Sequence, residues 1–261
     1  MKNIVVIPAV VNNDLQKFGG WSWMQCSIDA WTYWCKKNNC ELVVYDKPKH
    51  SDTSKYRVTW QRWFDVFDFL DSKNIEYDKV LLADACSIPK WDCNNFFDLV
   101  GDNLTATYDM DNLGWIYQSV QGYKELFNNY NLEIMKYINA GFVIFNKSHR
   151  QLFKNFEMMF YENKEKILEL QSTVRRGTDQ TPLNYFLQMN DVTIDTLPLQ
   201  YRVSHLHRKD LLSHNWQLNE DKTPFFVKYA SVWVFSGFDK QQRNKLMGQV
   251  WDMIKDNYEN K

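Results

Sequence analysis

The sequence predicts an α/β fold in which a mixed, mainly parallel sheet is covered by helices on both faces. Short apolar runs rich in Val, Ile and Leu, such as those at 3–8 and 79–84, alternate with longer segments whose apolar residues recur at helical spacing. Strands separated by helices are joined by crossovers, which favour parallel pairing. The 261 residues are enough for one large domain or two small ones, and we expect one domain spanning 1–261, with a core supplied by the 44% of residues that are apolar.

The first half of the chain alternates regularly between the two patterns. The run at 3–8 is β-branched and typical of a buried strand, and the segment from Trp21 has helical spacing. Thr59 is expected to cap a helix with an aromatic face. In order, we expect a strand at 3–8, a helix at 21–38, a strand at 41–46, a helix from 59 to 70, strands at 79–84 and 104–108, and a helix over 113–123.

The second half continues the alternation and ends in a helix. Pro182 suits the first turn of a helix, where a missing backbone donor costs little. The segment 202–222 is the least regular part and is expected to form a flap. In order, we expect a strand at 137–146, a helix through 152–160, a short helix at 178–190, strands at 193–197 and 225–235, and a helix at 239–258.

Composition limits the class of protein. Lys and Arg number 31 against 32 for Asp and Glu, so the overall charge indicates neither a nucleic-acid nor a membrane partner. The five cysteines form no C-x-x-C pair, which indicates reduced thiols rather than a zinc ribbon or a disulfide framework. With neither a signal peptide nor an apolar run long enough for a membrane span, a cytoplasmic protein is expected.

Several common site motifs are missing from the sequence. No G-x-G-x-x-G follows the first strand, and no Walker-type G-x-x-x-x-G-K occurs, which disfavours a dinucleotide site and a P-loop. No G-x-S-x-G is present, which disfavours an α/β-hydrolase. A nucleotidyltransferase is also disfavoured, because no Gly-rich basic loop follows the first strand.

Three short polar motifs lie where strands or helices are expected to end or begin. Asp84-Ala-Cys86 ends the apolar strand at 79–84, Asn139-Ala-Gly141 opens the strand at 137–146, and Asp179-Gln180 opens the helix at 178–190. Ligands of open parallel sheets bind beyond the carboxyl ends of the strands, where a carboxylate can hold a hard cation or a ribose hydroxyl. The motifs therefore predict one nucleotide-binding pocket at this edge.

The order of these motifs resembles that of the retaining glycosyltransferases of the GT-A fold. The resemblance is to the glycogenin-like and lipopolysaccharide-galactosyltransferase-like group, and in particular to small glycosyltransferase-like proteins of tailed bacteriophages. That group has D-x-D after a strand, N-x-G before a strand and D-Q at a helix start. The Thr-Trp-Gln-Arg segment ending at Arg62 and the Asp-Cys-Asn-Asn-Phe-Phe segment ending at Phe97 add to the likeness, which spans about 2–201.

The resemblance implies a hexosyl- or pentosyltransferase that uses a nucleotide-diphosphate sugar and retains the anomeric configuration. It implies an acceptor such as a modified (for example hydroxymethylated) DNA base, a polysaccharide or another glycan, or a protein, and, if the source is a phage, a place in the host cytoplasm. The implied catalytic residues are Asn139, Asp179 and Gln180. The implied donor-binding residues are Pro8, Arg62, Asp84, Cys86, Ala140 and Gly141.

The metal site departs from the family pattern. The resemblance implies Mn²⁺ or Mg²⁺ on Asp84, with His205 and His207 as candidate further ligands, but Cys86 replaces the second Asp of D-x-D. Hard cations prefer oxygen to sulfur, so metal binding is weakened, another ligand substitutes, or the protein is metal-independent or inactive. Asp92, Asp109 and Asp111 lie nearby in sequence.

Each residue also has an ordinary structural explanation. Asp84 can cap the turn after its strand, Arg62 can be a solvated helix residue, and Asp179 can cap its helix. Asn139 and Gly141 can belong to a turn, and each His can be a neutral surface residue. The rival function is a catalytically inactive GT-A-like protein that binds a nucleotide or sugar, which Cys86 favours.

Overall fold

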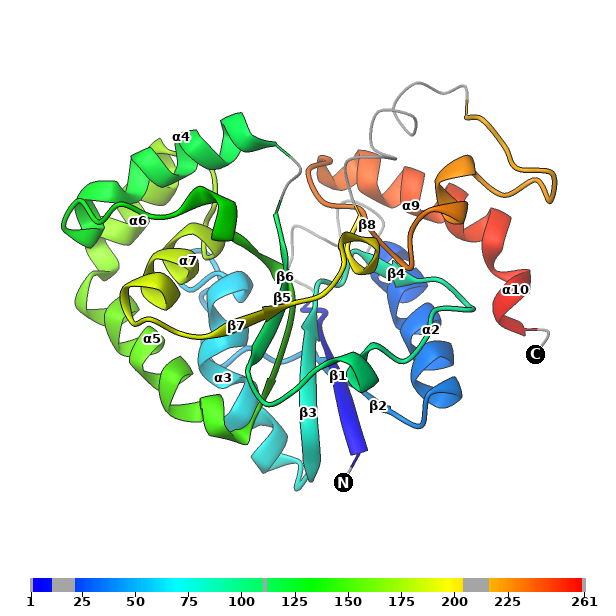
Figure 1. Cartoon of the computed structure of the whole chain (residues 1–261), viewed down its shortest axis with the longest axis horizontal. Helices are drawn as coiled ribbons and strands as arrows, with labels where there is room; N and C mark the ends of the chain where they lie inside the picture. The colour runs from blue at the N-terminus through cyan, green and yellow to red at the C-terminus, as the bar shows by residue number, and fades with distance from the viewer. Residues whose placement is uncertain (1, 11–21, 110–111, 204–215, 260–261) are drawn as a thin grey trace.

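A six-stranded sheet organises the computed structural model, which describes residues 2–10, 22–109, 112–203 and 216–259 (Figure 1). The strand order is β2-β1-β3-β6-β5-β7, and β6 runs antiparallel to β3 and β5 while the other neighbouring pairs are parallel. The strands are β1 (Lys2–Pro8), β2 (Glu41–Tyr45), β3 (Tyr77–Ala83), β5 (Leu104–Tyr108), β6 (Ile138–Asn146) and β7 (Ile194–Thr196). The mixed, mainly parallel α/β sheet predicted from the sequence is confirmed.

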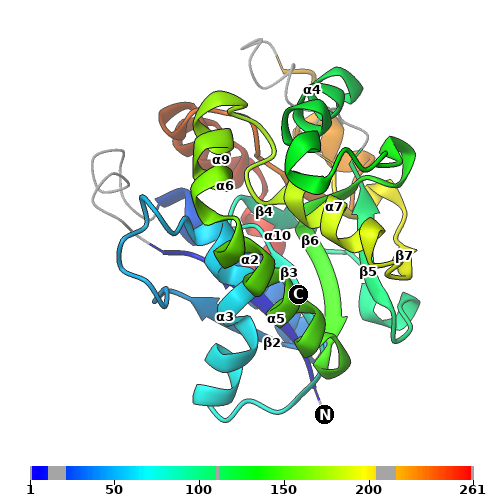
Figure 2. The ribbon, with the colours of Figure 1, turned by 90° about the vertical axis from the view of Figure 1, so that its left-hand side faces the viewer.

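Helices cover both faces of this sheet, with α3 and α5 side by side on one face and α2 and α9 on the other (Figures 1 and 2). Alternate strand residues point to opposite faces, so Val5 and Ile7 pack toward α2 while Ile4 and Val6 pack toward α3. The helices are α2 (Ser22–Lys37), α3 (Val58–Ser72), α4 (Leu113–Tyr123), α5 (Arg150–Glu162), α6 (Lys164–Thr173), α7 (Gln180–Met189), α9 (Lys240–Ile254) and α10 (Asp256–Glu259).

A second, two-stranded sheet ties the carboxyl-terminal part of the chain to the segment after β3. It pairs β4 (Ser87–Pro89) with β8 (Val232–Val234) in antiparallel register. The Phe235 backbone N–H extends this pairing by donating to the carbonyl of Cys86 (2.8 Å). The start of α9 is thereby held beside the Asp84–Cys86 segment.

Two tryptophan side chains of α2 form hydrogen bonds with the chain that follows β3. The indole of Trp31 donates to the Ser87 hydroxyl (3.0 Å), and that of Trp34 donates to the Cys93 carbonyl (3.1 Å). Both tryptophans are fully buried, so these donors would cost free energy if unpaired. The packing therefore restricts the position of the chain that leaves β3.

Two local predictions are wrong. The expected strand at 225–235 is a 3₁₀ helix at Phe225–Lys228 followed by the short β8, because the segment pairs with β4 rather than with the main sheet. Thr59 does not cap α3: the helix already begins at Val58, after Arg57, which makes no side-chain cap. Sequence analysis also did not predict α6 or β4.

The cysteines and the helices bear on the expectations drawn from composition. All five cysteines are buried and unbridged, as expected for reduced thiols. Among the helices that the structure describes, none combines the length and apolarity needed to cross a membrane. Most of the expected flap at 202–222 lies outside the described residues.

Candidate active site at the edge of the sheet

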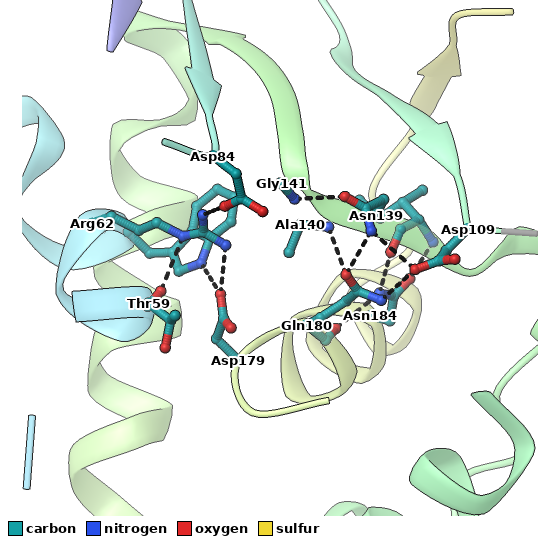
Figure 3. A network of polar contacts seen from close by, with 12 residues as sticks. Thr59, Arg62, Asp84, Asp109, Asn139, Ala140, Gly141, Asp179, Gln180 and Asn184 are labelled. Carbon is teal, nitrogen blue, oxygen red and sulfur yellow. Dashed lines mark hydrogen bonds and ion pairs between the residues drawn. The ribbon is translucent and has the colours of Figure 1, made fainter. Parts of the chain in front are cut away.

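The reversed strand β6 brings two of the predicted motifs together. Ala83 pairs with Phe142, and the Asp84 backbone N–H donates to the Gly141 carbonyl (2.9 Å). Because β6 is antiparallel to β3, its amino end meets the carboxyl end of β3. Asp84 and the Asn139–Gly141 motif therefore share one edge of the sheet (Figure 3).

Gly141 leaves the space that the Asp84 side chain occupies. A Cβ atom at position 141 would lie only 2.3 Å from Asp84 Oδ2 and 2.8 Å from its Cγ. Real Cβ atoms do not approach other atoms so closely, so a side chain here would displace the carboxylate. The glycine is required by this contact, and a simple turn would not require it.

Arg62, on α3, joins two carboxylates from distant parts of the chain. Its Nη1 donates to Asp84 Oδ1, its Nη2 donates to Asp179 Oδ2 (2.9 Å), and its Nε donates to the Thr59 carbonyl (3.2 Å). Burial acts to lower the pKa of Arg62, but the charges of Asp179 and Asp84 raise it overall. With only 5% of its surface exposed, Arg62 is not a solvated helix residue.

The Asp179 carboxylate turns toward α3 and does not cap α7. The Trp63 indole donates a second hydrogen bond to Asp179 Oδ2 (2.9 Å), and Asp179 makes no side-chain cap. Asp84 likewise uses its carboxylate for Arg62, while its backbone carbonyl accepts from Ser87 in the next turn. The capping explanations of both aspartates are therefore wrong.

A second polar network lies on the other side of Gly141 and centres on Gln180. Gln180 Oε1 accepts from Asn139 Nδ2 (2.9 Å) and from the Ala140 backbone N–H (3.1 Å). Gln180 Nε2 donates to Asp109 Oδ2 (2.8 Å), which also accepts from Asn139 Nδ2 (2.9 Å). The amide of Gln180 is thus held in one orientation at the start of α7.

Asp109 and Asn184 support this network. Asn184 Oδ1 accepts from the Ile138 N–H (2.7 Å) and its Nδ2 donates to the Ile138 carbonyl (2.9 Å), so α7 is fixed to the start of β6. Asp109 forms a buried ion pair with Arg202 (3.8 Å between Oδ1 and Nη1). Asp109 immediately follows the strand predicted at 104–108, so the strand-end position that drew attention to Asp84 also applies to it.

A pocket of about 620 Å³ opens beside Asp84 and Arg62. Its wall combines the ends of β1 and β3 with the starts of α3 and α9, and four of its described residues are cationic against the single carboxylate of Asp84. A positive, concave surface of this kind suits a phosphate-bearing ligand. The lining residues are Pro8, Val10, Met24, Thr53, Arg57, Val58, Thr59, Arg62, Asp84, Ala85, Cys86, Ser236, Lys240 and Arg243.

The described residues do not fit a hard divalent cation. Asp84 already pairs with Arg62, and Asp109 lies on the far side of Gly141 (Figure 3). Burial raises the pKa of the Cys86 thiol to about 11, so a neutral sulfur stands where the family has a carboxylate. Within the described ranges no group of three His, Cys, Asp or Glu side chains is arranged to hold a metal.

The structure brings most of the predicted site residues into one region. Pro8, Arg62, Asp84 and Cys86 line the pocket, while the catalytic candidates belong to the adjoining hydrogen-bond networks (Figure 3). Those adjoining residues are Asn139, Ala140, Gly141, Asp179 and Gln180. His205, His207 and Asp111 lie outside the described residues, and Asp92 pairs with Lys90 (3.0 Å) at the surface.

Sequence reasoning missed the contribution of the carboxyl-terminal part of the chain. Ser236, Lys240 and Arg243 line the pocket although they follow Cys86 by about 150 residues or more. The Arg243 guanidinium donates to the Phe235 carbonyl (2.9 Å), which fixes it near the β4–β8 sheet. No local pattern in 239–258 distinguishes these residues from an ordinary solvated helix start.

Comparisons with known proteins identify the fold. No protein-family model and no curated protein sequence matches the chain. The crystal structure of a glycosyltransferase involved in glycosylation of the major capsid of PBCV-1 has a TM-score of 0.54 and 8% identity, covering 96% of this chain and 100% of that one. The apo structure of the bifunctional glycosyltransferase WbbM has a TM-score of 0.53 and 15% identity, covering 97% of this chain and 51% of that one. The likeness at these identities concerns the fold, and it shows that this chain has the GT-A glycosyltransferase fold.

Proposed function

We propose that the protein is a glycosyltransferase that moves a sugar from a nucleotide-diphosphate sugar to an acceptor. The observation that supports this most is the convergence of Asp84, Arg62 and Asp179 beside a cation-rich pocket in a GT-A fold. The pocket volume of about 620 Å³ is in the range of small-molecule sites. Three distant segments meet there, as a donor site requires.

The donor diphosphate is proposed to lie against the cationic wall of the pocket. Arg57 lies just before α3, Lys240 and Arg243 lie on α9, and the buried Arg62 adds its positive charge from within the wall. Guanidinium and ammonium groups form strong charge-assisted hydrogen bonds with phosphate oxygens. They would stabilise the negative charge that develops on the diphosphate as its bond to the anomeric carbon breaks.

The donor sugar is proposed to lie over Gly141, between the two polar networks. The Asp84 side chain is 31% exposed, so it can still accept a hydrogen bond from a ribose or sugar hydroxyl. Asn139 and Gln180 would form the floor beneath the sugar. Since Gln180 Oε1 already accepts two hydrogen bonds, its proposed part is to orient the sugar rather than to attack it.

The acceptor, the sugar type and the stereochemistry are proposals from the resemblance. We propose retention, a hexosyl or pentosyl donor, and a modified DNA base, a glycan or a protein as acceptor. The PBCV-1 neighbour takes part in capsid glycosylation, which makes a virion protein one acceptor to test. A cytoplasmic place of action is likewise a proposal.

The first experiment is a thermal-shift screen of nucleotide sugars, followed by a donor-consumption assay. A ligand that binds only the folded state raises the apparent stability by mass action, so the correct donor raises the melting temperature. Asp84→Asn should lose this shift, whereas Asp92→Asn, at a surface ion pair, should keep it. No shift with any nucleotide sugar would contradict the proposal.

The second candidate is a binding protein that transfers nothing. Cys86 in place of a carboxylate favours it, because this departs from the family pattern at the site itself. A donor that stabilises the protein but is never consumed, by hydrolysis or by transfer to any acceptor class, would support this candidate.

A further inference from the structure

We propose that Gln61 is a positioning residue of the donor pocket, because its side chain fixes the loop that carries Thr53 and Arg57. This loop spans 46–57 and joins β2 to α3. It contains neither a strand nor a helix, yet Thr53 and Arg57 line the pocket beside Asp84. The inference rests on the proposed function, and it concerns how one wall of the donor site keeps its shape.

The side chain of Gln61 is almost completely buried, with 1% of the residue exposed, and the hydrogen bonds of its amide go to this loop. Its Oε1 accepts from the His50 N–H (2.7 Å), and its Nε2 donates to the His50 carbonyl (3.0 Å) and to the Tyr56 carbonyl. The amide thus pairs with the backbone of His50 as a residue of a neighbouring strand does. Because buried backbone groups cost free energy when they lack a partner, these bonds hold the loop in this position.

Side chains of α5 and α6 hold the same two loop residues. The rings of His50 and Tyr56 stack on each other, with centroids 4.2 Å apart. The Tyr161 hydroxyl forms a hydrogen bond with His50 Nε2 (2.8 Å), and Lys164 Nζ donates to the Tyr56 hydroxyl (2.6 Å). The loop is therefore fixed at positions 50 and 56, and its two pocket-lining residues lie between and directly after these points.

Gln61 and Arg62 are consecutive residues of α3 that serve different walls of the pocket. Successive side chains of a helix point about 100° apart, so the two residues reach in different directions. Arg62 bonds to Asp84 and Asp179, whereas Gln61 bonds to the loop. The short segment at the start of α3 thereby links the acidic residues of the pocket to its loop wall.

The position of the loop matters for binding because Arg57 directly follows the carbonyl that Gln61 holds. Arg57 is exposed and lines the pocket, where its guanidinium can donate to a phosphate oxygen. A displacement of about 1 Å is enough to weaken a hydrogen bond or a catalytic contact severely. If Gln61 served only the stability of the loop, its loss would change the melting temperature and leave the affinity of the folded protein unchanged.

The test is a double-mutant cycle on the affinity of the full chain for inorganic pyrophosphate, measured by calorimetry at a temperature at which each variant is folded. Gln61→Met removes the three hydrogen bonds to the loop without changing the charge. Arg57→Gln removes the proposed phosphate contact. Lys164→Met loosens the loop at Tyr56, and its matched control is Lys154→Met, which loses the same charge at an exposed position of α5.

We expect Gln61→Met to weaken pyrophosphate binding roughly tenfold in the parent chain but less than about twofold when Arg57→Gln is present, because the two residues act through one contact. Lys164→Met should weaken binding about threefold, and Lys154→Met should change it less, because screening limits the effect of a distant surface charge. A nucleotide sugar from the thermal-shift screen replaces pyrophosphate if the parent chain binds only the former.

Unchanged affinity in Gln61→Met or in Arg57→Gln would overturn the inference and leave the donor site intact. The same loss from Gln61→Met with and without Arg57→Gln would also overturn it. If Gln61→Met does not fold, equal affinities of Lys164→Met and Lys154→Met would have the same consequence. If the parent chain binds neither pyrophosphate nor any nucleotide sugar, the proposed function itself fails.

Discussion

At the scale of single residues, Arg62 supplies the positive charge that balances two carboxylates of the site. It is buried, and it pairs with Asp84 and Asp179, which come from β3 and from the start of α7. Arg150 offers a natural comparison, because it also pairs with two aspartates, Asp68 and Asp71, but is 30% exposed. One arginine therefore pairs with two aspartates both in the interior, at Arg62, and at the surface, at Arg150.

We expect Arg62→Met to lower the free energy of unfolding by about 3–5 kcal/mol, because the buried Asp179 and the partly buried Asp84 lose their counter-charge. Arg150→Met should cost at most about 1 kcal/mol, since water solvates its partners once the pair is gone. Urea unfolding of both variants measures the difference. Equal losses would show that the Arg62 cluster is not the buried anchor inferred from the structure.

Gly141 gives a second prediction at this scale. Gly141→Ala should shift Asp84 or the backbone, since the new Cβ would lie 2.3 Å from Oδ2, and the expected cost is about 1–3 kcal/mol. It should also weaken donor binding. Gly248→Ala in α9 is the control, because its Cβ meets nothing within 4 Å and alanine favours a helix by up to about 1 kcal/mol. Thermal melts and titrations with the proposed donor measure both effects. Equal stability and equal donor binding of the two variants would contradict the contact inferred between position 141 and Asp84.

At the scale of elements, the contact between α3 and α5 holds Arg62 in place. Trp60 and Phe64 of α3 pack against Phe156 and Phe160 of α5, with ring centroids 4.7 to 6.2 Å apart. This aromatic layer covers one face of the sheet below the site. The position of Arg62 therefore depends on a helix that contributes no side chain to the pocket.

We expect Phe156→Ala to lower the free energy of unfolding by about 3–5 kcal/mol, because it removes a fully buried ring and leaves a cavity. Met158→Ala, two residues away on the same helix and 57% exposed, should change it by less than about 0.5 kcal/mol. Chemical denaturation distinguishes them. A small effect of Phe156→Ala would mean that α3 is held mainly by its contact with the sheet.

The elements differ in how well the sequence alone predicts them. The strand predicted at 104–108 has its observed bounds, and both of its faces are largely buried although it includes two threonines. The segment 225–235 was not predicted correctly, since its apolar residues reflect packing in the small β4–β8 layer rather than a strand of the main sheet. The pairing of β8 with β4, rather than the local sequence pattern, determines the secondary structure of that segment.

The residues of the candidate site also differ in how well the sequence alone predicts them. Asp84, Gly141 and Asp179 could be found from their places at element ends, and Asp109 could have been found by the same rule. The pairing of Arg62 with Asp84 and Asp179 could not, because it depends on how α3 and the start of α7 pack together. Lys240 and Arg243 gave no local signal, since their place in the pocket comes from the pairing of β8 with β4.

At the scale of the whole molecule, the buried thiols predict a loss of stability at alkaline pH. Burial raises the pKa of Cys26, Cys40 and Cys86 to about 11 and that of Cys93 to about 12. Unfolded thiols titrate near their ordinary value of about 8.5–9. Above this pH the unfolded chain binds fewer protons than the folded chain, so the free energy of unfolding falls as pH rises.

We expect this fall between about pH 9 and 11, by at most about 1.4 kcal/mol per thiol for each pH unit, with no thiol contribution to the slope below about pH 8. Urea unfolding at about pH 8, 9 and 10, a range that brackets the pKa of an unfolded thiol, measures how the free energy of unfolding changes with pH. Cys93→Ala should show a shallower dependence than the parent chain. A free energy of unfolding that does not change over this range would contradict the burial of the thiols.

The pairing of β8 with β4 has a consequence for how the molecule is completed during synthesis. The strands that carry Asp84 and Asn139 are synthesised well before the part of the pocket wall formed by Lys240 and Arg243. A nascent or proteolytically shortened chain that stops before 232 would hold Asp84, Asn139 and Asp179 and lack the α9 side of the pocket. The pocket proposed to bind the donor would then be completed only when β8 pairs with β4.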